Sequence, residues 1–135
     1  MKFYSLKYRT RTPPGGQKMW KVEIDPNHRV DEGLLAHELV HVKQWYAAML
    51  LTFLLGAVLW YWVAPVLGFL ALAAPWAHGA LYRVKALRIL MELHAYKVHV
   101  KIGVGPGLPY RDREFAIKAM VGHGMDAKDA RRALG

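Results

Sequence analysis

The most informative segment is Ala36-His37-Glu38-Leu39-Val40-His41-Val42, in a chain of 135 residues. Two histidines four positions apart lie on the same face of an α-helix, because the helix repeats every 3.6 residues. That spacing lets both imidazole rings reach one metal ion, with Glu38 beside a water molecule that the metal holds. The segment therefore predicts a helix with a metal site. The alternative is a helix that carries two histidines without such a role.

Composition limits the class of protein. The length suits one domain with one hydrophobic core, which we place at residues 1–135. A net charge of +9 suits an anionic partner, such as lipid headgroups or nucleic acid. Alternatively, the charge only makes the chain soluble. The absence of cysteine excludes disulfides, thiolate metal ligands and cysteine nucleophiles. Residues 1–7 are basic with no apolar segment behind them, so we expect no signal peptide.

The segments before the motif predict a small β element. Residues 1–17 read as a basic arm or a loosely held strand that ends at the breaker Pro13-Pro14-Gly15-Gly16. Residues 18–24 alternate polar and apolar side chains, which predicts a half-buried strand. Asp31 is placed to cap a helix that carries the metal motif and continues through Trp45.

A long charge-free segment follows the motif. From Gln44 to Tyr82 there is no Asp, Glu, Lys or Arg. About 20 apolar residues cross a bilayer, so the segment suits one long helix or two short ones. Pro65 and Gly68 favour a break near the middle, which predicts an apolar helical hairpin over residues 47–82.

The ends of this segment favour a membrane as its partner. Basic residues flank both ends, which suits two ends on the cytoplasmic side: Lys43, Arg83, Lys85 and Arg88. In such a hairpin, the aromatic residues at the two ends would lie at the same depth in the membrane, Trp45 and Tyr46 at one end and Trp76 and Tyr82 at the other. Trp60 would lie near the tip. We expect membrane association on the cytoplasmic side, or docking on an apolar protein. The alternative is a hairpin that is buried against the helix with the motif or in a homo-oligomer.

The remainder of the chain reads as helical. Residues 83–102 have apolar positions close to a 3.6-residue period, which predicts one helix. Residues 103–109 are a glycine- and proline-rich loop. Two helices then complete the C-terminal segment 103–135, one from about Asp112 to Val121 and one capped by Asp126. The predicted fold class is mainly α with a small N-terminal β element.

A catalytic zinc ion needs a third protein ligand. Gln44 and Ala47 stand where proteases of the H-E-x-x-H-x-x-G-x-x-H type carry Gly and His, which excludes that type. A downstream acid or histidine remains. Glu92 is one candidate, although it could instead form a weak surface pair with Arg88, four residues earlier. His94 and His99 are further candidates, and each could also be a packed or solvated histidine.

The motif resembles that of the gluzincin metallopeptidases, which combine H-E-x-x-H with a Glu from a later helix. The residues that carry the resemblance are His37 to Trp45, Arg88, and Glu92 with Ala95 and Tyr96, and it extends over about residues 18–100. Small gluzincin-type peptidases of phage and bacterial genomes are similar, and so are membrane-embedded gluzincins with an apolar hairpin. The latter usually carry Asp where this chain has Tyr96. The resemblance implies Zn²⁺ on His37, His41 and Glu92, with Glu38 as general base.

The function that follows is zinc-dependent hydrolysis of peptide bonds. Glu38 accepts a proton from the water and passes it to the leaving amine. Tyr96 could donate a hydrogen bond to the developing oxyanion, or it could be a packing aromatic. His123, between two glycines, reads as a helix-end residue. Residues 18–24 could offer a strand edge to an extended peptide or protein substrate.

Two other functions compete with hydrolysis. A structural or membrane-docking protein, associated with a virion if the chain is phage-encoded, could keep a metal site without catalysis. Nucleic-acid binding by the C-terminal helices is disfavoured, because Lys128, Arg131 and Arg132 suit phosphate contact at best.

Overall fold

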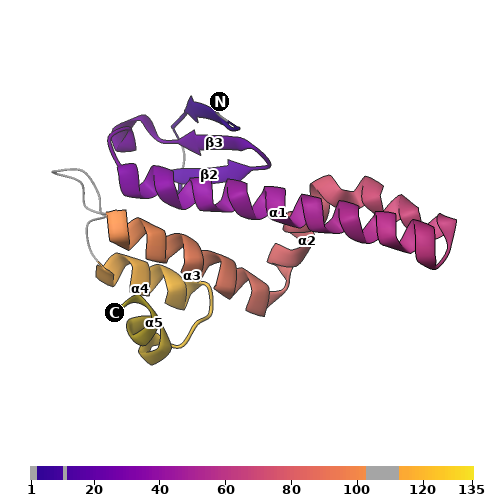
Figure 1. The fold of residues 1–135 in the computed structure, drawn as a ribbon. Helices are drawn as coiled ribbons and strands as arrows, with labels where there is room; N and C mark the ends of the chain where they lie inside the picture. Colours follow the sequence, from indigo (N-terminus) through magenta and orange to yellow (C-terminus); the bar gives the residue numbers. More distant parts are fainter. Residues whose placement is uncertain (1–2, 11, 103–112) are drawn as a thin grey trace.

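The computed structural model describes residues 3–10, 12–102 and 113–135. In these residues three short strands come first, and the rest of the chain is mainly helical (Figure 1). This arrangement confirms the predicted fold class, mainly α with a small N-terminal β element. The predicted loop at 103–109 and the predicted helix start at Asp112 lie outside the described residues.

The sheet holds β1 (Ser5–Tyr8), β2 (Gly15–Lys18) and β3 (Lys21–Ile24) in the order β1-β3-β2. β1 pairs with β3 in parallel, and β2 pairs with β3 in antiparallel fashion. Residues 1–17 were expected to be a basic arm or a loosely held strand, and the structure has strands there. The central position of β3 leaves β2 at an edge of the sheet.

The prediction of one strand over residues 18–24 is wrong. Lys18 pairs with Lys21, so Met19 and Trp20 form a two-residue turn between β2 and β3. Met19 has a φ of 58°, a left-handed conformation that such turns require. Glycine and asparagine usually mark these turns, and neither occurs here, so the alternating pattern hid the turn.

A short 3-10 turn, η1 (Pro26–His28), leads into the long helix α1 (Glu32–Trp62). Asp31 caps α1 as predicted, because its side chain accepts a hydrogen bond of 2.7 Å from the Leu34 amide. The N-terminal half of α1 packs against the sheet. The core of this contact comprises Val22, Ile24 and Val42, with Tyr4, Leu6, Leu34, Leu35, Leu39 and Tyr46 around it.

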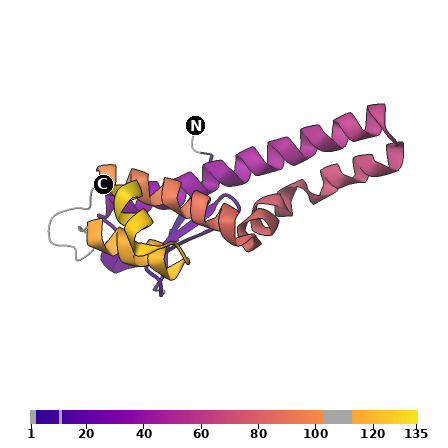
Figure 2. The same ribbon diagram turned by 90° about the horizontal axis from the view of Figure 1, so that it is seen from below.

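The C-terminal half of α1 and the segment after it form the predicted hairpin, which projects away from the rest of the molecule (Figure 2). The chain turns after Trp62 and returns as η2 (Pro65–Trp76), so the break at Pro65 is confirmed. η2 is a 3-10 helix of 12 residues, far longer than most. The Trp45 indole donates to the Pro75 carbonyl at 2.8 Å, which fixes the base of the hairpin.

The helix predicted over residues 83–102 is found, but it begins at Lys85 and not at Arg83. α2 (Ala77–Arg83) continues from η2, and α3 (Lys85–Ile102) is a separate helix. Val84, which joins them, is extended, with a ψ of 114°. The apolar residues on either side of Val84 stay in phase with a helical period, so the sequence shows no break there.

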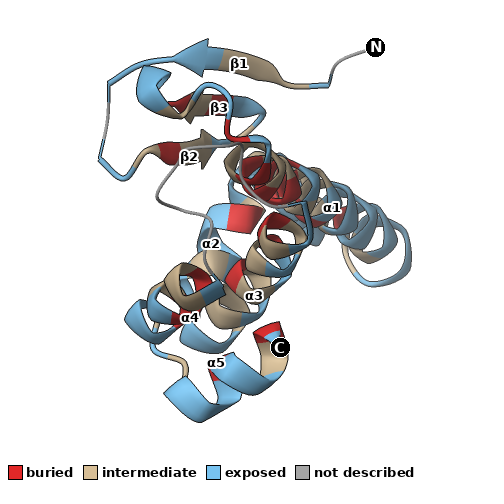
Figure 3. Cartoon of the chain, turned by 90° about the vertical axis from the view of Figure 1, so that its left-hand side faces the viewer, coloured by how far each residue is buried: buried red, intermediate tan, exposed pale blue. Residues whose placement is uncertain are grey.

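The C-terminal helices are α4 (Arg113–Gly122) and α5 (Ala127–Leu134), and Asp126 caps α5 as predicted. They pack on α3 through a second core of Ala116, Ile117, Met120, Ala130 and Leu134. Buried residues gather between α1, α3 and the neighbouring elements, whereas the projecting hairpin is mostly exposed (Figure 3). The interface between α1 and α3 is where the predicted metal residues lie.

Candidate metal centre

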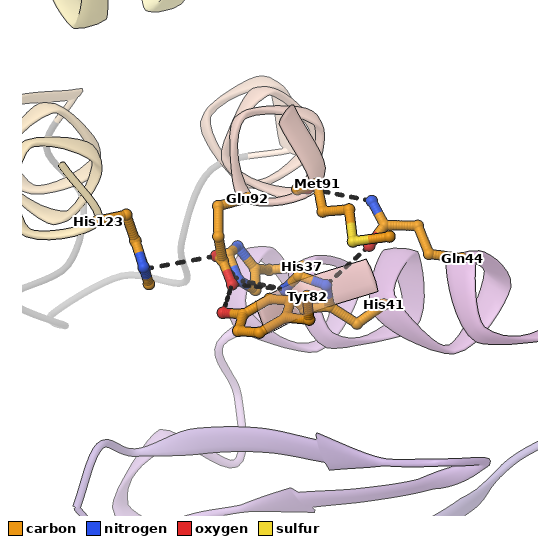
Figure 4. Close-up of polar contacts among 7 residues, drawn as sticks. All are labelled: His37, His41, Gln44, Tyr82, Met91, Glu92 and His123. Carbon is orange, nitrogen blue, oxygen red and sulfur yellow. Dashed lines mark hydrogen bonds and ion pairs between the residues drawn. The ribbon is translucent and has the colours of Figure 1, made fainter. Parts of the chain in front are cut away.

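Three side chains from two helices converge on one point (Figure 4). The Nε2 atoms of His37 and His41, both on α1, are 3.2 Å apart. Glu92 on α3 places Oε2 3.5 Å from His37 Nε2 and Oε1 3.4 Å from His41 Nε2. One donor atom from each residue lies within 4.8 Å of the others. Two imidazoles and a carboxylate are a known set of protein ligands for catalytic zinc, so the donors fit a metal ion.

Helix geometry accounts for this convergence. His37 and His41 are one turn apart on the face of α1 that packs against α3. Glu92 is only 4 % exposed, and its ion pairs among the described residues are with His37, His41 and His123. Glu92 is therefore not the exposed partner of Arg88, which was the alternative from the sequence.

Gln44 orients His41, a role that the sequence did not suggest. The Gln44 amide nitrogen donates to the Met91 carbonyl at 3.0 Å, which turns its amide oxygen toward His41. That oxygen lies 2.9 Å from His41 Nδ1 and can only accept, so Nδ1 carries the proton. His41 Nε2 then presents a lone pair to the centre. Partners of this kind hold metal-binding histidines in one tautomer and one orientation.

Tyr82 orients Glu92 and was also missed as a site residue. Its hydroxyl donates a hydrogen bond to Glu92 Oε1. Tyr82 belongs to α2, the helix that closes the base of the hairpin. From the sequence, Tyr82 only marked the end of the charge-free segment, and no local signal connects it with Glu92 ten residues later.

The centre is strongly coupled electrostatically. Burial alone would raise the pKa of Glu92, but hydrogen bonds with His37 and His41 outweigh it and hold that pKa far below its usual range. Burial lowers the pKa of His37. Burial acts in the same direction on His41, but the contact with Glu92 outweighs it and raises the pKa. Glu92 is therefore an anion, and a metal ion that binds Nε2 of His41 competes with protonation of that nitrogen.

Glu38 lies in the same cavity but outside the group of three donors. It is 6 % exposed, and it is packed against Gly15 of β2. A Cβ atom on Gly15 would lie 2.6 Å from Glu38 Oε1, so only glycine allows the carboxylate its place. Glu38 therefore lines the cavity separately from the three converging donors.

The other predicted candidates differ in position. Tyr96 lines the cavity with its ring centroid 4.4 Å from that of His37, and burial raises the pKa of its phenol, which stays protonated. His99 also lines the cavity but is not one of the three converging donors. His94 is exposed and faces a separate groove between α1 and α3, which removes it as a ligand candidate.

His123 lies closer to the centre than its place in the sequence indicated. It follows the last residue of α4, as expected of a helix-end residue, yet its Nε2 lies 3.7 Å from Glu92 Oε2. The contact arises because α4 packs on α3. The side chain is 30 % exposed, so it stands between the cavity and solvent.

The cavity that holds these groups has a volume of about 460 Å³. β2 with the two preceding prolines forms one wall, and α1, α2, α3 and α4 form the others. This volume is within the usual range of ligand pockets. The metal donors thus face a space that is large enough for a substrate side chain and backbone.

Comparison of the chain with protein-family models, with curated proteins and with solved structures finds no match.

Proposed function

We propose that this chain is a zinc-dependent peptidase of the gluzincin kind. The observation that carries the proposal is the convergence of His37, His41 and Glu92 within 4.8 Å, in a cavity that Glu38 also lines. A carboxylate placed next to a metal site, and not in its ligand set, is suited to act as a base.

His37, His41 and Glu92 would hold the zinc ion. When bound, zinc polarises a carbonyl group and lowers the pKa of a water molecule to about 7. Glu38 would serve as the general base, which takes a proton from a water molecule in the cavity and returns it to the nitrogen of the leaving amine. Tyr96, whose phenol keeps its proton, is placed to donate a hydrogen bond to the oxygen on which charge develops.

The edge strand β2 is the element best placed to hold an extended peptide. Residues 13–17 line the cavity, and among the described residues β2 pairs with β3 alone. A peptide that pairs with the free edge of β2 would pass in front of Glu38. The edge predicted from the sequence, residues 18–24, is displaced to β2, because β3 lies in the centre of the sheet.

The exposed hairpin favours a second candidate, a structural or membrane-docking protein, of a virion for example, that keeps the metal site without catalysis. Many of its apolar side chains are exposed, and none of residues 47–76 lines the cavity. The two functions differ in one property, which is turnover.

Hydrolysis of a broad peptide library by the zinc-loaded chain in detergent tests the proposal. We expect cleavage that a chelator abolishes and that zinc restores. Glu38→Gln keeps the shape and zinc content, and it lowers the rate by about 10²–10⁴. A zinc-loaded parent chain that cleaves no peptide would favour the structural candidate.

A further inference from the structure

We propose that the hairpin of residues 47–76 inserts into a lipid bilayer from one side and leaves by the same side. The charge-free chain from Ala47 to Trp76 comprises the C-terminal part of α1 and all of η2. By length and composition, Glu32–Trp62 and Pro65–Arg83 could each cross a membrane. Only 17 % and 11 % of their apolar windows are buried, whereas the core helix of a soluble protein is mostly buried.

The distribution of exposed side chains favours lipid over a protein groove. On α1, Trp60 and Leu55 mark the two ends of an exposed apolar arc of about 220°, at 100° per residue. The amphipathic face that a helix presents to a protein is about half as wide. The exposed large apolar residues of the returning arm are Val66, Leu67, Phe69, Leu70, Leu72 and Trp76. Lipid can cover both arms over such an arc.

The returning arm presents small residues to α1, and the Trp60 side chain of α1 lies against one of them, Gly68. Gly68, Ala71 and Ala74 recur every three positions, which places them on one face of the 3-10 helix η2. Gly56 of α1 approaches Ala71 so closely that a Cβ atom would lie 2.7 Å from the Ala71 amide nitrogen. Small residues between helices and large ones outside are typical of packing inside membranes.

The backbone of the tip is suited to hydrocarbon. The amides of Val63 and Ala64 donate to the Leu59 carbonyl at 3.1 and 3.0 Å, and the Leu67 amide donates to the Ala64 carbonyl at 3.0 Å. Pro65 has no amide hydrogen to satisfy. A bilayer core offers no water to unpaired amides, so internal pairing of this kind is required there.

The length of the hairpin determines how it sits. Residues 47–62 of α1 extend about 24 Å at 1.5 Å per residue, less than the hydrocarbon core of about 30 Å. The tip therefore stops short of the opposite headgroups. Lys43, Arg83 and Lys85 are exposed at the base, where they can contact anionic headgroups.

The metal centre lies next to this base. His41 precedes Ala47 by six residues, about 9 Å along α1. The returning arm continues into α2, whose Tyr82 binds Glu92 and whose His78 lines the cavity. If the proposed peptidase function holds, on which this step rests, the substrates are polypeptide segments that lie close to the membrane surface.

Depth-dependent quenching tests the insertion. The chain has no cysteine, so Val63→Cys at the tip and Leu90→Cys on α3 each give one labelled position. With vesicles of phosphatidylcholine and phosphatidylglycerol, we expect acyl-brominated lipid to quench the fluorophore at Val63→Cys and not at Leu90→Cys. An unquenched tip overturns insertion. If the unquenched Val63→Cys variant also has the mass of an oligomer in solution, the hairpins are covered by one another and not by lipid.

Charge substitution provides the matched control. Leu54→Glu places a charge within the hairpin and should weaken vesicle binding roughly 100-fold. Leu90→Glu, at a residue 61 % exposed on α3, should leave binding unchanged. Equal loss in both variants, or in neither, contradicts lipid insertion of the hairpin.

The substrate class is tested with one peptide in two forms, free and attached to vesicle lipid by an acyl chain. We expect the attached form to be cleaved at least about 10-fold faster, because both partners are held at one surface. Leu54→Glu should remove that advantage without changing cleavage of the free peptide. Equal rates for the two forms overturn the substrate class. If neither form is cleaved, the peptidase proposal and the substrate class fail together, while quenching still decides insertion.

Discussion

The Tyr82 hydroxyl donates a hydrogen bond to Glu92 Oε1, so α2 at the base of the hairpin is joined to the metal centre. Glu92 also faces His37 and His41, which makes Tyr82 a partner of the proposed ligand set and not a ligand itself. Such partners fix the direction in which a carboxylate presents its lone pairs. The relationship leads directly to a test of how the centre is held.

Tyr82→Phe should lower zinc affinity about 10- to 100-fold, because loss of an orienting partner has effects of that size. Competition with a chromogenic chelator measures the change. Tyr61→Phe at the tip, where the side chain is 78 % exposed, should bind zinc like the parent. Unchanged affinity in Tyr82→Phe would mean that packing alone orients Glu92.

Zinc should bind with a stoichiometry of one per chain through His37, His41 and Glu92. Because the three donors converge, the double substitution of His41→Ala and Glu92→Ala should remove nearly all bound metal. Elemental analysis of the purified protein measures it. His94→Ala is the control, since His94 faces a different groove. Near-stoichiometric zinc in the double variant would contradict this ligand set.

Met120→Ala should lower the free energy of unfolding by about 2–5 kcal/mol, because it leaves a cavity in the core that joins α4 and α5 to α3. Met120 is fully buried, whereas the neighbouring Val121 is 42 % exposed, so Val121→Ala should have a much smaller effect. Denaturant unfolding in detergent measures both. Equal effects would mean that this core contributes little to stability.

The parts of the fold that depend on local patterns could be predicted from the sequence. The caps at Asp31 and Asp126 and the break at Pro65 are confirmed, because short-range hydrogen bonds and backbone sterics determine them. The turn at Met19 and the break at Val84 were missed. In both cases the apolar pattern continues across the change in backbone direction, so periodicity cannot reveal it.

The candidate site also has parts that local patterns predict and parts that they do not. Helix spacing alone places His37 beside His41, and Glu92 joins them as expected from the resemblance. The contacts of Gln44 and Tyr82 depend on how α1, α2 and α3 pack, which no local pattern encodes.

Gly15→Ala should impair hydrolysis while zinc binding stays as in the parent. The added Cβ atom would lie 2.6 Å from Glu38 Oε1 and 2.7 Å from Leu34 Cδ1. Both distances are shorter than the van der Waals contacts of a Cβ atom allow. The carboxylate is the end of a flexible side chain, so it moves away from its place in the cavity. A displacement of about 1 Å at a catalytic group can cost about 10² in rate.

Two comparisons make the result specific to Glu38. Gly122→Ala should behave like the parent, because an added Cβ atom there has nothing within 4 Å. In a chain that already carries Glu38→Gln, Gly15→Ala should cause little further loss, since both changes act on the same proton transfer. Steady-state kinetics with one cleavable peptide measures all four variants. If the losses from Gly15→Ala and Glu38→Gln instead multiply, Gly15 acts on the substrate strand, and the close contact with Glu38 is not what limits the rate.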